Sequence, residues 1–158
     1  MEYRIERLDA FTVVGQETKL TKFQKENVKL CKMFWKQFNH HIKKAYLHQS
    51  ENWIKYAFME RKDDILVYYC AIPKKIVVPK EFSVKEIPPL QYLVVHHIGD
   101  MDKIYDTYHT VYKEIVPNSG YSLNQEYFLH FEKYDYRFYW NATNSVIEIW
   151  IPIKGEIN

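Results

Sequence analysis

The sequence predicts an α+β fold in which two β-α-β-β units together form an antiparallel sheet with two main helices. Three observations support this prediction. Runs with strand-like alternation are interrupted by two stretches whose apolar residues recur at helical spacing. The order strand, helix, strand, strand occurs twice, and the two occurrences align at a nearly constant distance. We therefore expect one domain over residues 1–158, with pseudo-repeats at residues 1–73 and 82–153.

The first half of the chain is predicted to form a strand, a helix and a hairpin. Tyr3–Gly15 has the pattern of a strand, and Asn27–Lys44 follows as an amphipathic helix. Two further strands, Trp53–Glu60 and Ile65–Ile72, are separated by the turn-forming residues 61–64. The apolar stripe of the helix consists of Val28, Cys31, Trp35, Phe38 and Ile42.

The second half repeats this order after a short linker. Phe82–Ile98 is predicted to be a strand, and Asp102–Val116 a helix that Asp100 caps and a Pro-Asn-Ser-Gly sequence ends. Strands Glu126–Tyr134 and Val146–Ile153 close the chain. Because the elements follow the same order as in the first half, a duplication is predicted.

The duplication can be tested by the spacing of matching segments. The aligned segments are Leu8-Asp9-Ala10 with Ile87-Pro88-Pro89, and Ile72-Pro73 with Ile151-Pro152. In both pairs the residue numbers differ by 79 (87 − 8 and 152 − 73). In the middle of the hairpin, Tyr56–Glu60 aligns instead with Phe128–Glu132, which is an offset of 72 (132 − 60). The second hairpin is therefore expected to be about seven residues longer than the first.

The composition excludes several function classes. With 22 basic and 20 acidic residues, the net charge of +2 gives no field that favours nucleic acid or an anionic membrane. No apolar run approaches the roughly 20 residues that span a bilayer, and no secretion signal is visible, so we expect a soluble, cytoplasmic protein. Cys31 and Cys70 lack zinc-site spacing, and the adjacent pairs His40-His41 and His96-His97 point apart. No metal and no cofactor are therefore expected.

The last strand carries a carboxylate among apolar residues. Isoleucines at alternate positions of residues 147–153 are expected to pack under the helices, while Glu148 and Trp150 share the opposite face. The offset of 79 makes Tyr69 the pseudo-symmetric partner of Glu148. A buried carboxylate requires a cation, hydrogen bonds or a raised pKa. Two hypotheses stay open: Glu148 faces a ligand groove, or it lies on a solvated sheet face and pairs with a cation such as Arg137.

Several short motifs of the second half resemble the GyrI-like small-molecule-binding domains, the effector-binding domains of AraC-type and MerR-type transcription regulators. The motifs are Phe82–Val95, Gly99, Val116–Tyr121, Phe131–Asp135 and Ile147–Ile153. The resemblance covers roughly the whole chain in the order of its elements. It implies two strand-helix-strand-strand units that combine around a central ligand groove.

The resemblance also implies which residues bind the ligand. Drug-binding relatives place an acidic residue of the final strand against the positive charge of a lipophilic ligand, and the matching residue here is Glu148, with Trp150 in register. Tyr69 follows from the internal repeat. Further candidates for the walls of the groove, with core packing as the alternative for each, are Tyr92, Phe58 and His130.

From this resemblance we expect a stand-alone binding domain for a small, lipophilic cationic or aromatic molecule. Such a domain would act as a sensor or sequestering protein in bacterial transcription regulation or drug response. No segment is left for a helix-turn-helix reader, so direct binding of nucleic acid is not expected. Two alternatives stay open: a hydrolase of electrophilic small molecules that uses Glu148, which is the less favoured class, and a gyrase-inhibitor-like interaction module. A protein partner or a homodimer is compatible with each.

Overall fold

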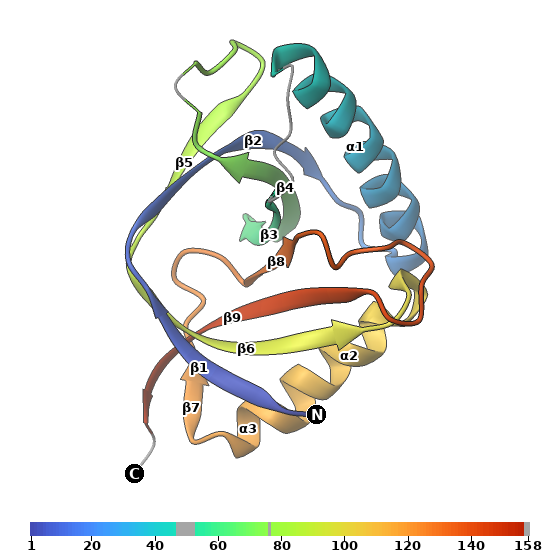
Figure 1. The fold of residues 1–158 in the computed structure, drawn as a ribbon. Coiled ribbons are helices and arrows are strands. Elements are labelled where there is room, and N and C mark those ends of the chain that lie inside the picture. Colours follow the sequence, from blue (N-terminus) through green and yellow to red (C-terminus); the bar gives the residue numbers. More distant parts are fainter. Residues whose placement is uncertain (47–52, 76, 157–158) are drawn as a thin grey trace.

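The computed structural model describes residues 1–46, 53–75 and 77–156. These residues form an α+β fold with two helical regions and an antiparallel sheet of nine strands, which confirms the predicted fold class. The strand order is β1-β6-β9-β8-β3-β4-β2-β5, with β7 paired to β9 (Figure 1). No helix in this part of the chain is long and apolar enough to cross a membrane.

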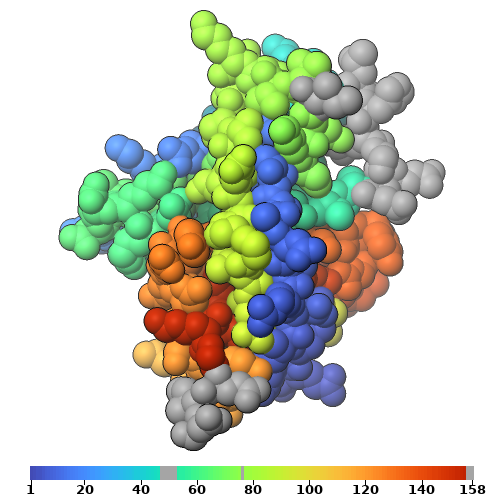
Figure 2. All heavy atoms as spheres, turned by 90° about the vertical axis from the view of Figure 1, so that its left-hand side faces the viewer, coloured from blue at the N-terminus to red at the C-terminus, as the bar shows by residue number. Residues whose placement is uncertain are grey.

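The two halves are joined by a pair of long bent strands. The first strand consists of β1 (Tyr3–Leu8) and β2 (Phe11–Lys19), and the second of β5 (Ser83–Ile87) and β6 (Leu90–Ile98). β1 pairs with β6 and β2 with β5, and the register is the same on both sides of the two breaks. Figure 2 shows these two chain segments running side by side down one side of the molecule. Asp9-Ala10 interrupts the first of these strands and Pro88-Pro89 the second.

Each half completes its part of the sheet with a hairpin. In the first half, β3 (Lys55–Lys62) and β4 (Ile65–Pro73) meet at a turn in which Asp63 and Asp64 have positive φ. In the second half, β8 (His130–Tyr134) pairs with the long β9 (Val146–Glu156). The sequence did not predict the short β7 (Tyr121–Leu123), which pairs with β9. β3 and β8 pair with each other and thereby join the two hairpins.

Both predicted helices are present. The first is α1 (Gln24–Ala45). The second is built from the 3₁₀ turn η1 (Met101–Lys103), α2 (Ile104–Thr110), the π-helical η2 (Val111–Ile115) and α3 (Val116–Asn118). Asp100 accepts a hydrogen bond from the backbone N–H of Asp102 at 3.1 Å, as predicted for its cap.

The repeat offset of 79 holds for the outer strands but not for the middle ones. Adding 79 to the residue numbers of β2 gives those of β6, and adding 79 to Ala71 gives Trp150. Tyr56 pairs with Ala71, and Phe131 pairs with Trp150, so the offset between β3 and β8 is 75 (131 − 56). The predicted offset of 72 is therefore wrong, and the second hairpin is four residues longer (79 − 75). Residues 126–129, predicted to be part of the strand, lie outside β8.

The sheet separates two apolar clusters. On the helix face, the alternate isoleucines of β9 pack with residues of both helices, as predicted, and this cluster includes Phe38, Ile42, Ile104 and Val111. The other cluster is mainly aromatic and consists of Val13, Phe58, Tyr69, Ala71, Ile87, Leu90, Tyr92, Val94, Phe128, Phe131 and Trp150. We call the side of the sheet that carries this second cluster the aromatic face.

Candidate functional site

Glu148 lies near the start of β9, between its sheet partners His96 on β6 and Lys133 on β8. Strand alternation directs it to the aromatic face together with Trp150. Only 7% of Glu148 is exposed, so its carboxylate requires partners within the protein.

The Glu148 carboxylate has four such partners. Oε1 accepts a hydrogen bond from the indole N–H of Trp150 at 2.9 Å, and Oε2 accepts one from Nη2 of Arg137 at 2.8 Å. Nη2 of Arg4 lies 3.5 Å from Oε1, and Nε2 of His96 lies 3.8 Å from Oε2. The second hypothesis is correct in the pairing of Glu148 with Arg137 and wrong in the solvated face, because Glu148 is buried. That Glu148 faces a ligand groove stays a prediction.

Arg137 is fixed in place by a second carboxylate. It lies in the β8–β9 connection, where Asp135 accepts hydrogen bonds from its Nε at 2.9 Å and its Nη2 at 2.8 Å. Burial of Glu148 favours the neutral acid, but the hydrogen bonds from Arg137 and Trp150 outweigh this effect. The pKa of Glu148 consequently lies below its ordinary value, and the group is a carboxylate at neutral pH.

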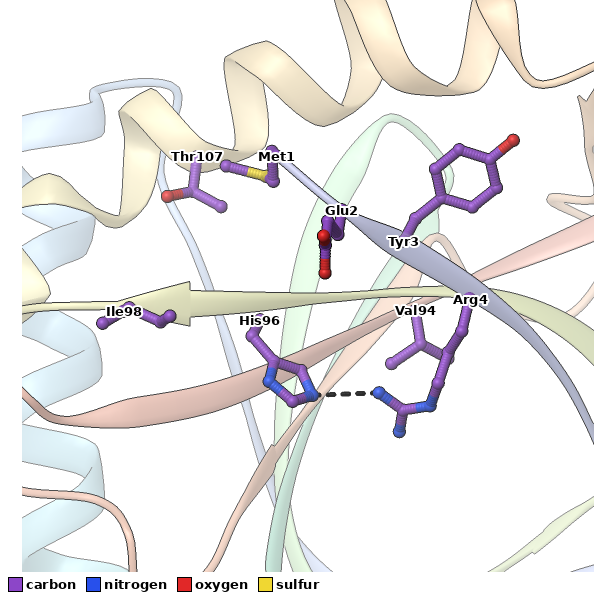
Figure 3. Close-up of a pocket in the computed structure, with 8 residues that line it drawn as sticks. All are labelled: Met1, Glu2, Tyr3, Arg4, Val94, His96, Ile98 and Thr107. Carbon is purple, nitrogen blue, oxygen red and sulfur yellow. Dashed lines mark hydrogen bonds between the residues drawn. The ribbon is translucent and has the colours of Figure 1, made fainter.

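Arg4 is the less firmly held cation of the site. Its guanidinium carbon lies 5.6 Å from the centre of the Trp150 ring, within the range of a cation–π contact. Its Nη1 lies 2.9 Å from Nε2 of His96, and Figure 3 shows these two side chains pointing toward each other from β1 and β6. Burial lowers the pKa of His96, which favours the neutral ring that accepts this hydrogen bond. The Arg4 side chain is 40% exposed.

The aromatic wall beside Glu148 is closely packed. Trp150 and Phe131 stack with their ring centres 5.5 Å apart and their planes 10° apart. The ring of Tyr92 meets Trp150 edge-on at 5.4 Å, and the ring of Tyr56 meets Phe131 edge-on at 5.6 Å. Among the described residues, the Tyr92 hydroxyl is the single buried side-chain polar atom without a hydrogen-bond partner within the protein.

Two cavities open next to this group of residues. One, of about 370 Å³, is bordered by Phe11, Tyr56, Phe131, Lys133 and Trp150, together with residues 8–10 and Pro73. The other, of about 490 Å³, is lined by Arg4, Val94 and His96 and by residues at the start of β1 (Figure 3). Trp150 thus borders one cavity, and its cation–π partner Arg4 borders the other.

The structure brings most of the predicted site residues together. Trp150, Tyr92 and Phe58 belong to the apolar cluster of the aromatic face, and Trp150 donates to Glu148. Tyr69 belongs to the same cluster, but its hydroxyl donates to the Ser83 carbonyl at 2.8 Å. No metal could be held by three His, Cys, Asp or Glu side chains anywhere in the described ranges.

His130 lies on the opposite side of the sheet from Glu148. Its Nδ1 is 2.9 Å from the Tyr112 hydroxyl, and its ring centre is 4.5 Å from that of Tyr108, so it packs under the second helix. The wrong offset of 72 had matched His130 with Phe58. With the observed offset, His130 corresponds to Lys55, which also points to the helix side and donates to Asn39.

Sequence reasoning missed Arg4, His96 and Asp135 as members of the site. Alternation along β1 would have placed Arg4 on one face with Glu6 and Leu8, but nothing in the pattern identified its partner across the sheet. The pairing of Glu148 with His96 follows from the β6–β9 register, which a single strand does not reveal.

The model of the family of integron-associated effector-binding proteins, Cass2, matches residues 4–153. The chain belongs to this family. The Cass2 family is one of effector-binding domains, and small-molecule binding is therefore the general function of the chain. The predicted resemblance to GyrI-like domains is confirmed at the level of fold and family.

Solved structures agree with the fold of this Cass2 family member. SAV2435 bound to tetraphenylphosphonium is 19% identical, with 98% of this chain and 95% of that chain covered and a TM-score of 0.73. The C-terminal domain of EcmrR is 15% identical, with 97% of each chain covered and a TM-score of 0.65. The integron cassette protein VCH_CASS2, from the mobile metagenome of Vibrio cholerae, is 15% identical, with 96% and 95% covered and a TM-score of 0.62. No curated protein sequence matches the chain significantly.

Proposed function

We propose that the chain binds a lipophilic cation with aromatic groups on its aromatic face, with the positive charge of the ligand beside Glu148 and its rings against Trp150, Tyr92 and Phe58. The protein would act as a sensor or sequestering protein for such molecules. In the bacterial cytoplasm, this role would serve transcription regulation or drug response.

One observation carries the proposal: the site already holds a cation of the protein in this manner. The Arg4 guanidinium lies against the Trp150 ring and within 3.5 Å of the Glu148 carboxylate. These are the contacts that a ligand cation would make, because both the charge of the carboxylate and the face of the aromatic ring attract a cation. Arg4 is partly exposed, so a ligand can displace it into solvent, whereas Arg137 is anchored by Asp135.

Two further features support a ligand on this face. The Tyr92 hydroxyl is buried without a hydrogen-bond partner among the described residues. Such a group destabilises the folded protein by about 1–3 kcal/mol, and a hydrogen bond to a ligand or a water molecule would offset this cost. The adjoining cavity of about 370 Å³ falls within the size range of small-molecule sites. The similar fold of SAV2435 has been solved with tetraphenylphosphonium, a cation that carries four phenyl rings.

The geometry favours binding over hydrolysis. A general base works best when its pKa lies near the working pH. The pKa of Glu148 is lowered, and its oxygens already accept hydrogen bonds from Trp150 and Arg137, so the carboxylate is a weak base. We therefore assign Glu148 the role of an electrostatic partner for the ligand.

The test is calorimetric titration of the protein with tetraphenylphosphonium, comparing the unchanged chain with Glu148→Gln. Loss of a charge-assisted contact of about 1.5–3 kcal/mol corresponds to a decrease in affinity of about 10- to 150-fold. Glu86→Gln, an exposed residue on β5, is the matched control and should bind as the unchanged chain does. Equal affinity of the Glu148→Gln protein, shown to be folded by its thermal transition, would refute the proposal. Turnover of an electrophilic substrate that Glu148→Gln abolishes would favour the hydrolase instead.

A further inference from the structure

The helix face of the molecule contains a separate cavity of about 340 Å³. It lies between α1, the start of β3 and the connection from β8 to β9, and Figure 1 shows this connection running beside α1. Its lining consists of Lys32, Trp35, Lys36, Asn39, Trp53, Lys55, Tyr134, Phe138 and Trp140. None of these residues borders the cavities next to Glu148.

Aromatic rings form the walls of this cavity, which we call the tryptophan cavity. Trp35, Trp53 and Trp140 are three of the four tryptophans of the chain. Trp35 is fixed, since its indole N–H donates to the Tyr68 hydroxyl at 2.8 Å and its ring meets Tyr134 edge-on at 5.2 Å. Rings held in this way offer flat apolar surfaces to a planar molecule at little cost in conformational entropy.

Positive charge surrounds these rings. Nζ of Lys32 lies 5.1 Å from the Trp140 ring centre, and Nζ of Lys55 lies 5.4 Å from that of Trp53. Lys36 is one helical turn after Lys32 on α1 and also borders the cavity. None of the lining residues is acidic, and within the described ranges these three lysines form no salt bridge.

Lys55 is the least exposed of the three lysines. Its Nζ donates to Oδ1 of Asn39 at 2.6 Å, and among the described residues it forms no salt bridge with a carboxylate. Burial lowers the pKa of Lys55, because removing an ammonium group from water disfavours its charged form. An anion in the cavity would offset this cost.

We propose that the tryptophan cavity is a second binding site, for a small organic anion that combines one or two aromatic rings with a carboxylate or sulfonate group. The aromatic rings of the ligand lie between the tryptophans, and its anionic group faces Lys32, Lys36 and Lys55. This site is on the opposite side of the sheet from Glu148, and its ligand has the opposite charge, so it does not depend on the function proposed above.

Nuclear magnetic resonance of the tryptophan indole N–H groups tests the proposal directly. The full chain labelled with ¹⁵N is titrated with 2-naphthoate and, separately, with the uncharged 2-naphthalenemethanol. We expect 2-naphthoate to shift the indole signals of Trp35, Trp53 and Trp140 and to leave Trp150 unshifted. The uncharged compound should bind about 100-fold more weakly, because it loses ion pairs with Lys32 and Lys36 that each contribute about threefold in affinity and one with the partly buried Lys55 that contributes about tenfold.

Two exposed lysines provide variants that are not expected to affect folding. Lys32→Gln and Lys36→Gln should each weaken 2-naphthoate binding about threefold, and the double variant about tenfold. Lys29→Gln, exposed on α1 and outside the cavity lining, is the matched control and should bind unchanged. Lys55→Met should weaken binding about tenfold because it removes the partly buried charge.

Three results would overturn the proposal. In the first, 2-naphthoate leaves the indole signals of Trp35, Trp53 and Trp140 in place. In the second, it shifts them but binds no more tightly than 2-naphthalenemethanol, so that the cavity is only an apolar hollow. In the third, the double variant at Lys32 and Lys36 binds as tightly as the Lys29→Gln control.

Discussion

Arg4 provides the sharpest test of how the site beside Glu148 holds positive charge. If the Arg4 guanidinium occupies the place that a ligand cation would take, the two compete for the same carboxylate and the same Trp150 ring. The substitution Arg4→Met keeps an unbranched side chain but removes the charge. We expect it to increase the affinity for tetraphenylphosphonium, the opposite of the usual effect of removing a residue from a binding site.

The expected magnitude follows from the geometry. At the 3.5 Å that separates Nη2 of Arg4 from Oε1 of Glu148, two unit charges attract by about 5 kcal/mol at an effective dielectric constant of about 20. The Arg4 side chain is 40% exposed and also pairs with Glu6, so solvent and competition reduce the net contribution to about 1 kcal/mol. This value corresponds to an increase in ligand affinity of about fivefold.

Calorimetric titration of the Arg4→Met protein with tetraphenylphosphonium measures this effect. Arg7→Met is the control, because Arg7 is exposed on the same strand but points to the other face of the sheet. Urea unfolding should show that Arg4→Met costs no more than about 1 kcal/mol in the free energy of unfolding. An affinity that is unchanged or decreased would show that Arg4 does not stand in for the ligand, and the binding proposal would lose the observation that carries it.

Three further predictions concern stability. Tyr92→Phe should raise the free energy of unfolding without ligand by about 1–2 kcal/mol, because it removes a buried hydroxyl without a partner; a destabilised variant in urea unfolding would show that the hydroxyl is satisfied. Gly15→Ala should lower the free energy of unfolding by about 2 kcal/mol or more, since the new Cβ would lie 1.9 Å from the Cys70 carbonyl oxygen. The neighbouring Gln16→Ala is the control and should be almost neutral. Equal unfolding midpoints of the two variants would contradict this prediction. Burial lowers the pKa of His130 from 6.5 to about 3, so the unfolded chain binds a proton that the folded chain does not, and stability should decrease as the pH falls through this range by at most about 1.4 kcal/mol per pH unit. His130→Gln should reduce the dependence of the free energy of unfolding on pH by this amount, and a variant with the same slope as the unchanged chain would assign the slope to other groups.

The sequence was most informative where one periodicity dominates a segment. The alternation of isoleucine with other residues in β9 correctly predicted which side of the sheet packs under the helices, because only one register buries all four isoleucines. The offset of 79 correctly matched the bent strands, whose breaks are marked by Asp9-Ala10 and Pro88-Pro89. The π-helical η2 was not predicted, since its apolar spacing differs little from that of an ordinary helix over five residues.

The error in the middle hairpin shows how strongly a site prediction depends on register. The predicted and observed offsets for β3 and β8 differ by three (75 − 72), which is an odd number. Because side chains alternate along a strand, an odd error exchanges the two faces. The wrong offset matched Phe58 with His130, which packs under the second helix. The residue of β8 that pairs with Phe58 and lies on the aromatic face is Phe131. Because Tyr56–Glu60 and Phe128–Glu132 have similar sequences, the error in the offset was not visible in the sequence.

Apart from Glu148 and Arg137, the charged members of both proposed sites were not predicted from the sequence, for a different reason. The partners of Glu148 come from β1 and from the β8–β9 connection, and the lysines of the tryptophan cavity come from α1 and β3. The net charge of +2 averages over these separate groups. On the aromatic face, the carboxylates of Glu148 and Asp135 compensate Arg4 and Arg137, so a ligand cation has to displace a cation that is already bound. On the helix face, the described residues that line the cavity include three lysines and no carboxylate, so positive charge would face a ligand anion. A weakly charged chain can therefore offer sites of opposite preference on the two faces of one sheet.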